Sequence, residues 1–357
     1  MLLAALALTV LAPRPAEAIP VFAHRYGLSC QACHTAIPHL TAFGEEFRAR
    51  GYRLPGIAPR AAFPAAVKVN LQYSGEAEAG LPKAVVDEVE VLTGGSIGAR
   101  GSYFAEQYVV DGGRPGRTRD LWAGWRATPD GARIPAGLRA GQFTLDLPVD
   151  PETFRETTDH YAIWDQTAGE NPFAFFAPKT GLALSAGNPN RGFSASIAAV
   201  IGHEPGSGLP SRGIDRHLSL QHAAGNVTFS AYRYDGTRPV DGVDDRFWRE
   251  GTGLSVAHGR ARFDAVYQRG FDAHASADGP LVSSGAFVQL RYDVTPRLFG
   301  VARYDGTQDT AFHRALIAGA GYRVARNVRF TVFDTLHRDA GTGARRNSLS
   351  TALLFAY

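Results

Sequence analysis

The sequence contains very little sulfur. Of its 357 residues one is methionine, at the first position, and two are cysteines, Cys30 and Cys33. Two cysteines three positions apart exclude any disulfide framework larger than one small loop. The formal net charge is only +3 and 20% of the residues are charged, so the composition gives no indication of a nucleic-acid partner. Apolar runs long enough for a membrane-spanning helix are also missing, because the longest are interrupted within about ten residues.

The first 18 residues predict export from the cytoplasm. Residues 1–12 are an apolar run, and the Ala-Glu-Ala at 16–18 is the small-residue cleavage site that follows such a run in secretory signal peptides. A membrane anchor is the alternative, but spanning a bilayer takes roughly 20 apolar residues. We therefore expect residues 1–18 to be a signal peptide and the mature chain to begin at Ile19, without any methionine.

Residues 30–34, Cys-Gln-Ala-Cys-His, match the attachment pattern of a c-type haem. Two thiols add to the two porphyrin vinyl groups, whose separation the two intervening residues match, and His34 then lies under the iron as the proximal axial ligand. A redox cysteine pair, a zinc half-site and a chance match are the alternatives. The sequence has no second Cys/His cluster for zinc and no βαβ frame of the thioredoxin kind. We therefore predict one covalent haem c held by Cys30, Cys33 and His34.

The second axial ligand of such a haem cannot be methionine, because the mature chain has none. Another histidine, the α-amino group of Ile19 and a five-coordinate iron remain open. His24 and His39 are the nearest histidines in sequence. His39 follows His34 by five residues, which makes the opposite haem face awkward to reach, whereas His24 has more freedom. A histidine at such a position is more often a solvated surface residue, and inward-pointing histidines later in the chain are further candidates.

A short helix is predicted after the motif, because Leu40, Phe43 and Phe47 fall at helical spacing between residues 40 and 50. Its aromatic face would pack on the porphyrin. Fewer than about 45 residues cannot bury much surface without a cofactor or a supporting wall. We therefore expect residues 19–62 to be a small, mainly helical haem segment that depends on both.

From residue 67 onward the pattern changes to strict alternation. In residues 67–74, 260–268 and 286–294, apolar side chains alternate with polar ones, as in strands that are apolar on one face only. Such segments recur at 67–75, 86–99, 102–111, 118–127, 136–145, 179–187, 191–201, 215–223, 225–235, 247–257, 259–269, 282–293, 297–305, 313–323, 326–336 and 347–357. About sixteen strands is an even number, as single-chain bacterial barrels have. We expect residues 63–357 to form a 16-stranded antiparallel transmembrane β-barrel.

The connections between these strands alternate in length, as in outer-membrane barrels. Long loops are predicted near 146–178, 202–214, 236–246, 270–281 and 337–346, with short turns between them. The last strand alternates apolar residues and ends on the aromatic Tyr357, as outer-membrane barrels commonly do. A soluble β-sandwich or propeller is the main alternative, but neither requires alternating loop lengths. With the short turns in the periplasm, the haem segment and Tyr357 both fall on the periplasmic side.

The N-terminal segment resembles a known family, the fused monohaem cytochrome–porins of bacterial outer membranes. The best-known members of that family are iron oxidases. The pattern is carried by Pro20, Phe22, Ala23, Cys30, Cys33, His34, Pro38, Leu40, Phe43, Gly44, Phe47, Gly51 and Tyr52. This match covers about 35 residues, and beyond it the resemblance is one of architecture. One departure is His-Arg-Tyr-Gly at 24–27, where the iron oxidases typically have Arg-Gln-Thr-Gly.

The resemblance implies a protein of the bacterial outer membrane whose haem segment lies in or against the barrel lumen. It would pass electrons between an extracellular donor, with Fe(II) as one candidate, and a periplasmic carrier such as a soluble cytochrome. Whether that makes it an Fe(II) oxidase stays open. A diffusion porin whose haem-bearing plug is regulatory, and a sensor or non-iron reductase, are the alternatives.

Two groups of barrel residues have a further expected role. Polar residues predicted to face the lumen would position the plug and the haem propionates, or else simply line a pore; they are Lys68, Arg262, Asp264, Arg291 and Asp293. The long loop 146–178 combines carboxylates and a histidine with many aromatic residues. Carboxylates and imidazole suit hard cations such as Fe(II), so this loop is predicted either to gather metal or to act as a constriction.

Overall fold

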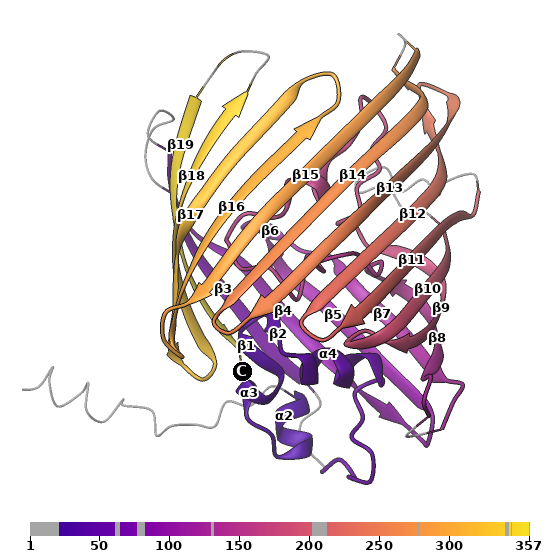
Figure 1. Cartoon of the computed structure of the whole chain (residues 1–357), viewed down its shortest axis with the longest axis vertical. Coiled ribbons are helices and arrows are strands. Elements are labelled where there is room, and N and C mark those ends of the chain that lie inside the picture. The colour runs from indigo at the N-terminus through magenta and orange to yellow at the C-terminus, as the bar shows by residue number, and fades with distance from the viewer. Residues whose placement is uncertain are drawn as a thin grey trace, which may run out of the picture.

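The computed structural model shows a closed β-barrel with a small helical segment at one of its ends (Figure 1). The structure describes residues 21–60, 65–76, 83–129, 132–201, 213–276, 279–339, 343 and 345–356. The predicted signal peptide, residues 1–18, and the terminal Tyr357 lie outside the described residues.

Sixteen long antiparallel strands make up the described barrel wall, and the short β6 (Arg114–Pro115) adds to the edge of β5. The long strands are β3 (Ala65–Glu76), β4 (Lys83–Ile97), β5 (Gly101–Asp111), β7 (Thr118–Arg126), β8 (Ala136–Phe143), β9 (Lys179–Asn188), β10 (Arg191–Ile201), β11 (Asp215–Ala224), β12 (Val227–Val240), β13 (Val243–His258), β14 (Ala261–Ser276), β15 (Gly279–Asp293), β16 (Leu298–Gln308), β17 (Phe312–Ala325), β18 (Val328–Asp339) and β19 (Arg345–Ala356). Strand β19 pairs with β3 and closes the barrel. The predicted fold class is confirmed.

The barrel wall is apolar outside and polar inside, which is the reverse of a soluble protein. On β3, Lys68 and Asn70 are buried, while Leu71 and Tyr73 are 38% and 41% exposed on the outer face. Because successive side chains of a strand point to opposite faces, alternation in the sequence becomes a lipid-compatible outer surface around a polar lumen.

Two of the predicted long loops are wrong. Strands β12 and β13 continue through residues 236–246 and meet at a tight turn, where Asp241 and Gly242 have φ angles of 47° and 82°. Strands β14 and β15 likewise take up most of residues 270–281. The polar composition of these stretches suggested loops, yet their carboxylates are buried inside the lumen: Asp245 and Asp272 both accept hydrogen bonds from the side chain of Asn171.

The N-terminal segment is a compact unit at the end of the barrel that carries the short turns and the C-terminus (Figure 1). It consists of α2 (Val21–Tyr26), α3 (Cys30–Cys33), β1 (His34–Ala36), β2 (His39–Leu40) and α4 (Ala42–Ala49). We call this segment, residues 21–60, the plug. The predicted helix between residues 40 and 50 is thus present as α4, and Thr41 caps it by accepting a hydrogen bond from the backbone N–H of Gly44.

The long connection between β8 and β9, residues 144–178, folds back into the lumen and packs on the inner wall. We call it the lumen loop. It contains the short helix α5 (Ala162–Asp165). Its core residues are fully buried against wall residues of β9, β10, β12, β13, β14 and β15; the cluster comprises Phe143, Leu145, Leu147, Val149, Phe154, Tyr161, Ile163, Trp164, Phe173, Phe175, Ala183, Ala198, Val200, Tyr232, Tyr234, Phe247, Val266 and Phe287. Among the described residues, no helix is both long and apolar enough to cross a membrane.

Candidate functional site

The two cysteines of the haem motif lie at the two ends of a single helical turn, α3, and both thiols are free. Burial raises the pKa of Cys30, and burial together with the neighbouring Cys30 raises the pKa of Cys33 to about 11. Reactive redox cysteines instead have lowered pKa values. Two free thiols at the ends of one helical turn fit attachment of a haem, and their raised pKa values differ from those of reactive redox cysteines.

His34 follows this turn directly and begins the β1–β2 hairpin. Its Nδ1 lies 3.1 Å from the carbonyl oxygen of Pro38, within the same hairpin. A metal-binding histidine usually donates one ring N–H to a backbone carbonyl in this way, which orients the other nitrogen as the ligand. Burial lowers the pKa of His34 to about 4, so the imidazole is neutral, and neutral imidazole is the form that coordinates metal.

A cavity of about 910 Å³ lies between the plug and the barrel wall, and all three motif residues line it. On the plug side Phe22 and Phe47 contribute apolar surface; on the wall side Trp122 does so, beside small polar residues. A porphyrin needs an apolar pocket with a few polar groups at its rim. The residues present therefore fit a haem attached at Cys30 and Cys33.

The plug packs on the wall through stacked aromatic rings. Phe22 stacks on Tyr52 with ring centroids 4.3 Å apart, and Tyr52 in turn stacks on Phe104 and Trp122 of the wall at 5.5 and 6.1 Å. Within the plug, an added Cβ at Gly44 would lie only 2.3 Å from the Cys33 carbonyl oxygen. Only glycine allows α4 to approach the haem-motif turn this closely.

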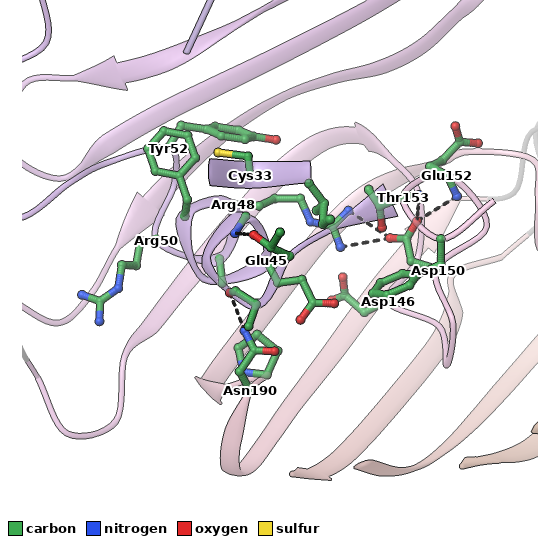
Figure 2. Close-up of a pocket in the computed structure, with 18 of the residues that line it drawn as sticks. Cys33, Glu45, Arg48, Arg50, Tyr52, Asp146, Asp150, Glu152, Thr153 and Asn190 are labelled. Atoms are coloured by element: carbon green, nitrogen blue, oxygen red, sulfur yellow. Dashed lines mark hydrogen bonds and ion pairs between the residues drawn. The ribbon is translucent and has the colours of Figure 1, made fainter. Parts of the chain in front are cut away.

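One short stretch of the lumen loop, residues 150–156, holds the plug in place, and we call it the clasp. Arg48 of α4 donates two hydrogen bonds, of 2.9 and 3.0 Å, to Asp150 (Figure 2). The backbone N–H of Leu40 donates to the carbonyl of Thr153 at 3.2 Å. A third contact joins His39 of β2 to Glu156.

The His39–Glu156 contact is part of a buried ionic cluster. His39 Nδ1 bonds to Glu156, and Arg291 of β15 donates to both Glu156 oxygens at 2.6 Å. All three side chains are at least nine-tenths buried. His39 thus has one ring nitrogen engaged with the barrel. The backbone of His24, the other predicted distal ligand, belongs to α2, and its side chain lies outside what the structure describes.

The five lumen residues predicted to position the plug are paired with carboxylates or cations of the barrel. Lys68 lies 2.6 Å from Glu90, and within the predicted group Arg262 pairs with Asp264 at 3.0 Å and Arg291 with Asp293 at 2.8 Å. Of these residues, Arg291 contacts the plug through His39. Lys68, Arg262 and Asp293 line the cavity beside the plug.

The lumen loop does not provide a metal-collecting site. Among the described residues, no group of three or more His, Cys, Asp or Glu side chains could hold a metal ion. The loop carboxylates pair with arginines instead: Asp150 with Arg48, and Glu152 with Arg119. With its buried aromatic core, the loop fills part of the lumen.

The plug-holding role of Asp150, Thr153 and Glu156 was not predicted from the sequence. The signal that these positions leave is a set of acidic residues in an aromatic-rich loop. Their partners in the plug lie more than 100 residues away in sequence, at separations of 102 for Arg48–Asp150 and 117 for His39–Glu156.

No protein-family model matches the chain, and no curated protein matches its sequence. Solved structures do match the fold. An anion-selective porin from Comamonas acidovorans has a TM-score of 0.64 at 11% identity, covering 82% of this chain and 98% of that one. OmpF of Salmonella typhi, in complex with daunomycin, gives 0.60 at 13%, covering 82% and 97%. The outer membrane channel DcaP of Acinetobacter baumannii gives 0.58 at 10%, covering 82% and 96%. The chain shares the barrel fold of outer-membrane porins.

Proposed function

We propose that this chain lies in the bacterial outer membrane and passes electrons across it through one covalently attached haem c. The observation that carries the proposal is the Cys-x-x-Cys-His turn, which faces a cavity of about 910 Å³ inside the mouth of a porin-like barrel. A haem there would supply a one-electron carrier, which no side chain of the motif provides by itself.

The chain's own residues have three tasks in this proposal. Cys30 and Cys33 fix the group at the edge of the plug, and His34 offers its second ring nitrogen as the iron ligand, because the first is bound to Pro38. The clasp, residues 150–156, anchors the plug inside the barrel. The barrel itself replaces the hydrocarbon core of the membrane, about 30 Å thick, by protein and a polar lumen.

The proposed route joins an extracellular donor to a soluble carrier in the periplasm. The plug lies at the short-turn end of the barrel, which in outer-membrane barrels is the periplasmic end. Fe(II) remains a candidate donor, and the carrier remains of the soluble-cytochrome type. No metal-collecting cluster among the described residues distinguishes iron from other donors.

Reconstitution into liposomes tests the proposal. With the barrel in the membrane, external Fe(II) should reduce an enclosed acceptor such as ferricyanide, and the purified protein should show a Soret band. The Cys33→Ala variant should lose transfer to the background level while its barrel keeps the heat-modifiable gel mobility of the wild type. A wild-type protein without a Soret band would contradict the proposal.

A diffusion porin with a haem-bearing plug is the second candidate, favoured by the fold match to porins, one of them named as anion-selective. The plug occupies one end of the lumen, and the lumen loop forms a buried core within it. Both would narrow a solute pathway. Liposomes containing the protein should therefore retain small sugars and anions; rapid leakage without electron transfer would favour the porin.

A further inference from the structure

The two ends of the barrel differ in the sign of their exposed charge. At the short-turn end, seven arginines are exposed in the part of the chain that the structure describes: Arg60, Arg100, Arg133, Arg191, Arg260, Arg297 and Arg326. The acidic residues described at that end are all at least partly buried. Glu45, Glu46 and Asp293 are half-buried there, and Glu46 and Asp293 are paired with Arg50 and Arg291. We call the seven arginines the basic rim.

The opposite end carries charges of both signs. Exposed Arg114, Arg314 and Arg345 there are accompanied by exposed Asp241 and Asp244. Arginine is the usual basic residue throughout this chain, because only three of its 37 basic residues are lysines. Exposed arginines are therefore expected at both ends, and the two ends differ in whether exposed acidic residues accompany them. Exposed arginines that are not accompanied by exposed acidic residues, as Asp241 and Asp244 accompany those at the other end, are therefore found at the short-turn end.

The basic rim surrounds the haem motif. Arg100 and Arg260 line the same cavity as Cys30, Cys33 and His34. Arg326 lies in the turn between β17 and β18. Its backbone carbonyl accepts a hydrogen bond of 3.2 Å from the side chain of Gln31, which follows Cys30 directly. These arginines therefore stand at the edge where a haem would be closest to the periplasm.

We propose that the basic rim is the docking surface of the electron carrier, and that this carrier is a soluble protein with an acidic patch around its redox group. This inference rests on the proposed function and specifies its partner. Arg100 and Arg260 are exposed residues of the turns between β4 and β5 and between β13 and β14, and both line the cavity of the haem motif. This position beside the cavity favours a soluble partner over anionic lipid headgroups, which would contact the outer wall.

The chemistry at this surface is a single electron transfer. One electron moves between the haem iron and the redox group of the bound partner, one being oxidised as the other is reduced, and no bond forms or breaks. Opposite charges would steer the two proteins together and raise the association rate by about 10- to 1,000-fold. The Debye length is about 10 Å at 0.1 M salt and about 3 Å at 1 M, so docking should weaken steeply as salt is added.

Binding to the full chain in nanodiscs of zwitterionic lipid tests the inference. The probes are an acidic flavodoxin and, for comparison, a basic cytochrome c. The rim variant carries Arg100→Glu, Arg260→Glu and Arg326→Glu. The matched control carries Arg114→Glu, Arg314→Glu and Arg345→Glu, the same charge change at the other end. All six side chains are exposed, and barrel assembly is checked by heat-modifiable gel mobility.

We expect the wild type and the control to bind the flavodoxin at low salt, and the rim variant to bind it at least about tenfold more weakly. The basic cytochrome should show no such loss. Equal flavodoxin binding by the rim variant and the control would overturn the inference. So would a rim-dependent binding of anionic phospholipid vesicles without binding of the flavodoxin.

The same measurement on Cys33→Ala separates this inference from the proposed function. Binding does not require the haem, so this variant should bind the flavodoxin as the wild type does. If the wild type binds the flavodoxin through the rim yet shows no Soret band, the electron-transfer function fails while the acidic-partner surface stands. If a Soret band is present and the rim reversal leaves binding unchanged, only the docking surface fails.

Discussion

One part of the lumen is a cavity beside the plug and another is a packed core around the lumen loop. Strand β12 borders both parts. On β12, the inward-facing Thr228 and Ser230 line the plug cavity, whereas the next two inward-facing residues, Tyr232 and Tyr234, belong to the buried core of the lumen loop. All four alternate in the same register. The alternation decides which side chains face inward, and their size decides whether that part of the lumen becomes a cavity or a solid core.

The largest expected effect on stability concerns the packed core around the lumen loop. Trp164 is fully buried and packs on Phe175 and Tyr232 at ring-centroid distances of 5.8 and 5.7 Å. Trp164→Ala would leave a large void, so the free energy of unfolding should fall by about 4 kcal/mol. Urea unfolding followed by gel mobility measures this.

Trp125→Ala is the matched control for that substitution. Trp125 lies on the outer face of β7 and is 51% exposed, so its removal creates no internal void and should change stability by less than about 1 kcal/mol. Liposomes with Trp164→Ala should also leak more solute than those with Trp125→Ala. If both variants unfold at the same urea concentration, the loop core does not stabilise the barrel.

The strands could be predicted because each carries its own local signal. Period-two alternation needs only neighbours in sequence, and all sixteen predicted strands are present. Local signals also located α4 and the haem motif. The errors at 236–246 and 270–281 have one cause: buried carboxylates such as Asp245 and Asp272 resemble loop residues until their partner, Asn171, is seen inside the lumen.

The clasp could not be predicted, because its pairing depends on the closed barrel. Nothing near Asp150 in sequence indicates Arg48, and nothing near Glu156 indicates His39. These contacts form only after the barrel has brought loop and plug together. The same holds for the charge difference between the two ends, since the seven arginines of the basic rim come from separate turns, from the plug and from the start of β10.

The second expected effect concerns how firmly the plug is held. Glu156→Gln would remove the buried one of the two carboxylates paired with Arg291 and weaken the bond to His39, so the plug should become less stable by about 3 kcal/mol. Hydrogen exchange or protease protection of residues 21–60 measures this opening directly, without any haem-dependent activity.

Glu152→Gln is a close control, since it changes the same residue type four positions away. Glu152 pairs with Arg119 of the barrel wall. Its substitution should lower the stability of the wall while leaving plug protection near that of the wild type. Equal loss of protection in both variants would mean that loop stability in general, and not the Glu156 contact, holds the plug.

The smallest expected effect is a pH dependence of plug protection. It distinguishes the contact of α4 with the clasp, through Arg48 and Asp150, from the contact of the β1–β2 hairpin, through His39 and Glu156. Burial acts to raise the pKa of Asp150, but the guanidinium of Arg48 and the backbone N–H groups of Thr153 and Glu152 outweigh it and hold that pKa below its usual value. A carboxylate with a lowered pKa contributes stability above its unfolded pKa of about 3.9, and the contribution is lost as the pH falls through the folded value.

Loss of the Asp150 charge should therefore lower plug protection in the wild type below about pH 4. Asp150→Asn should reduce protection at neutral pH by about 1 kcal/mol, because Arg48 is partly exposed and solvent screens the pair. The difference between wild type and variant should shrink as the pH falls below about 4, since both then lack the charge. A difference that stays constant down to pH 3 would show that Asp150 holds α4 through its hydrogen bonds and not through its charge.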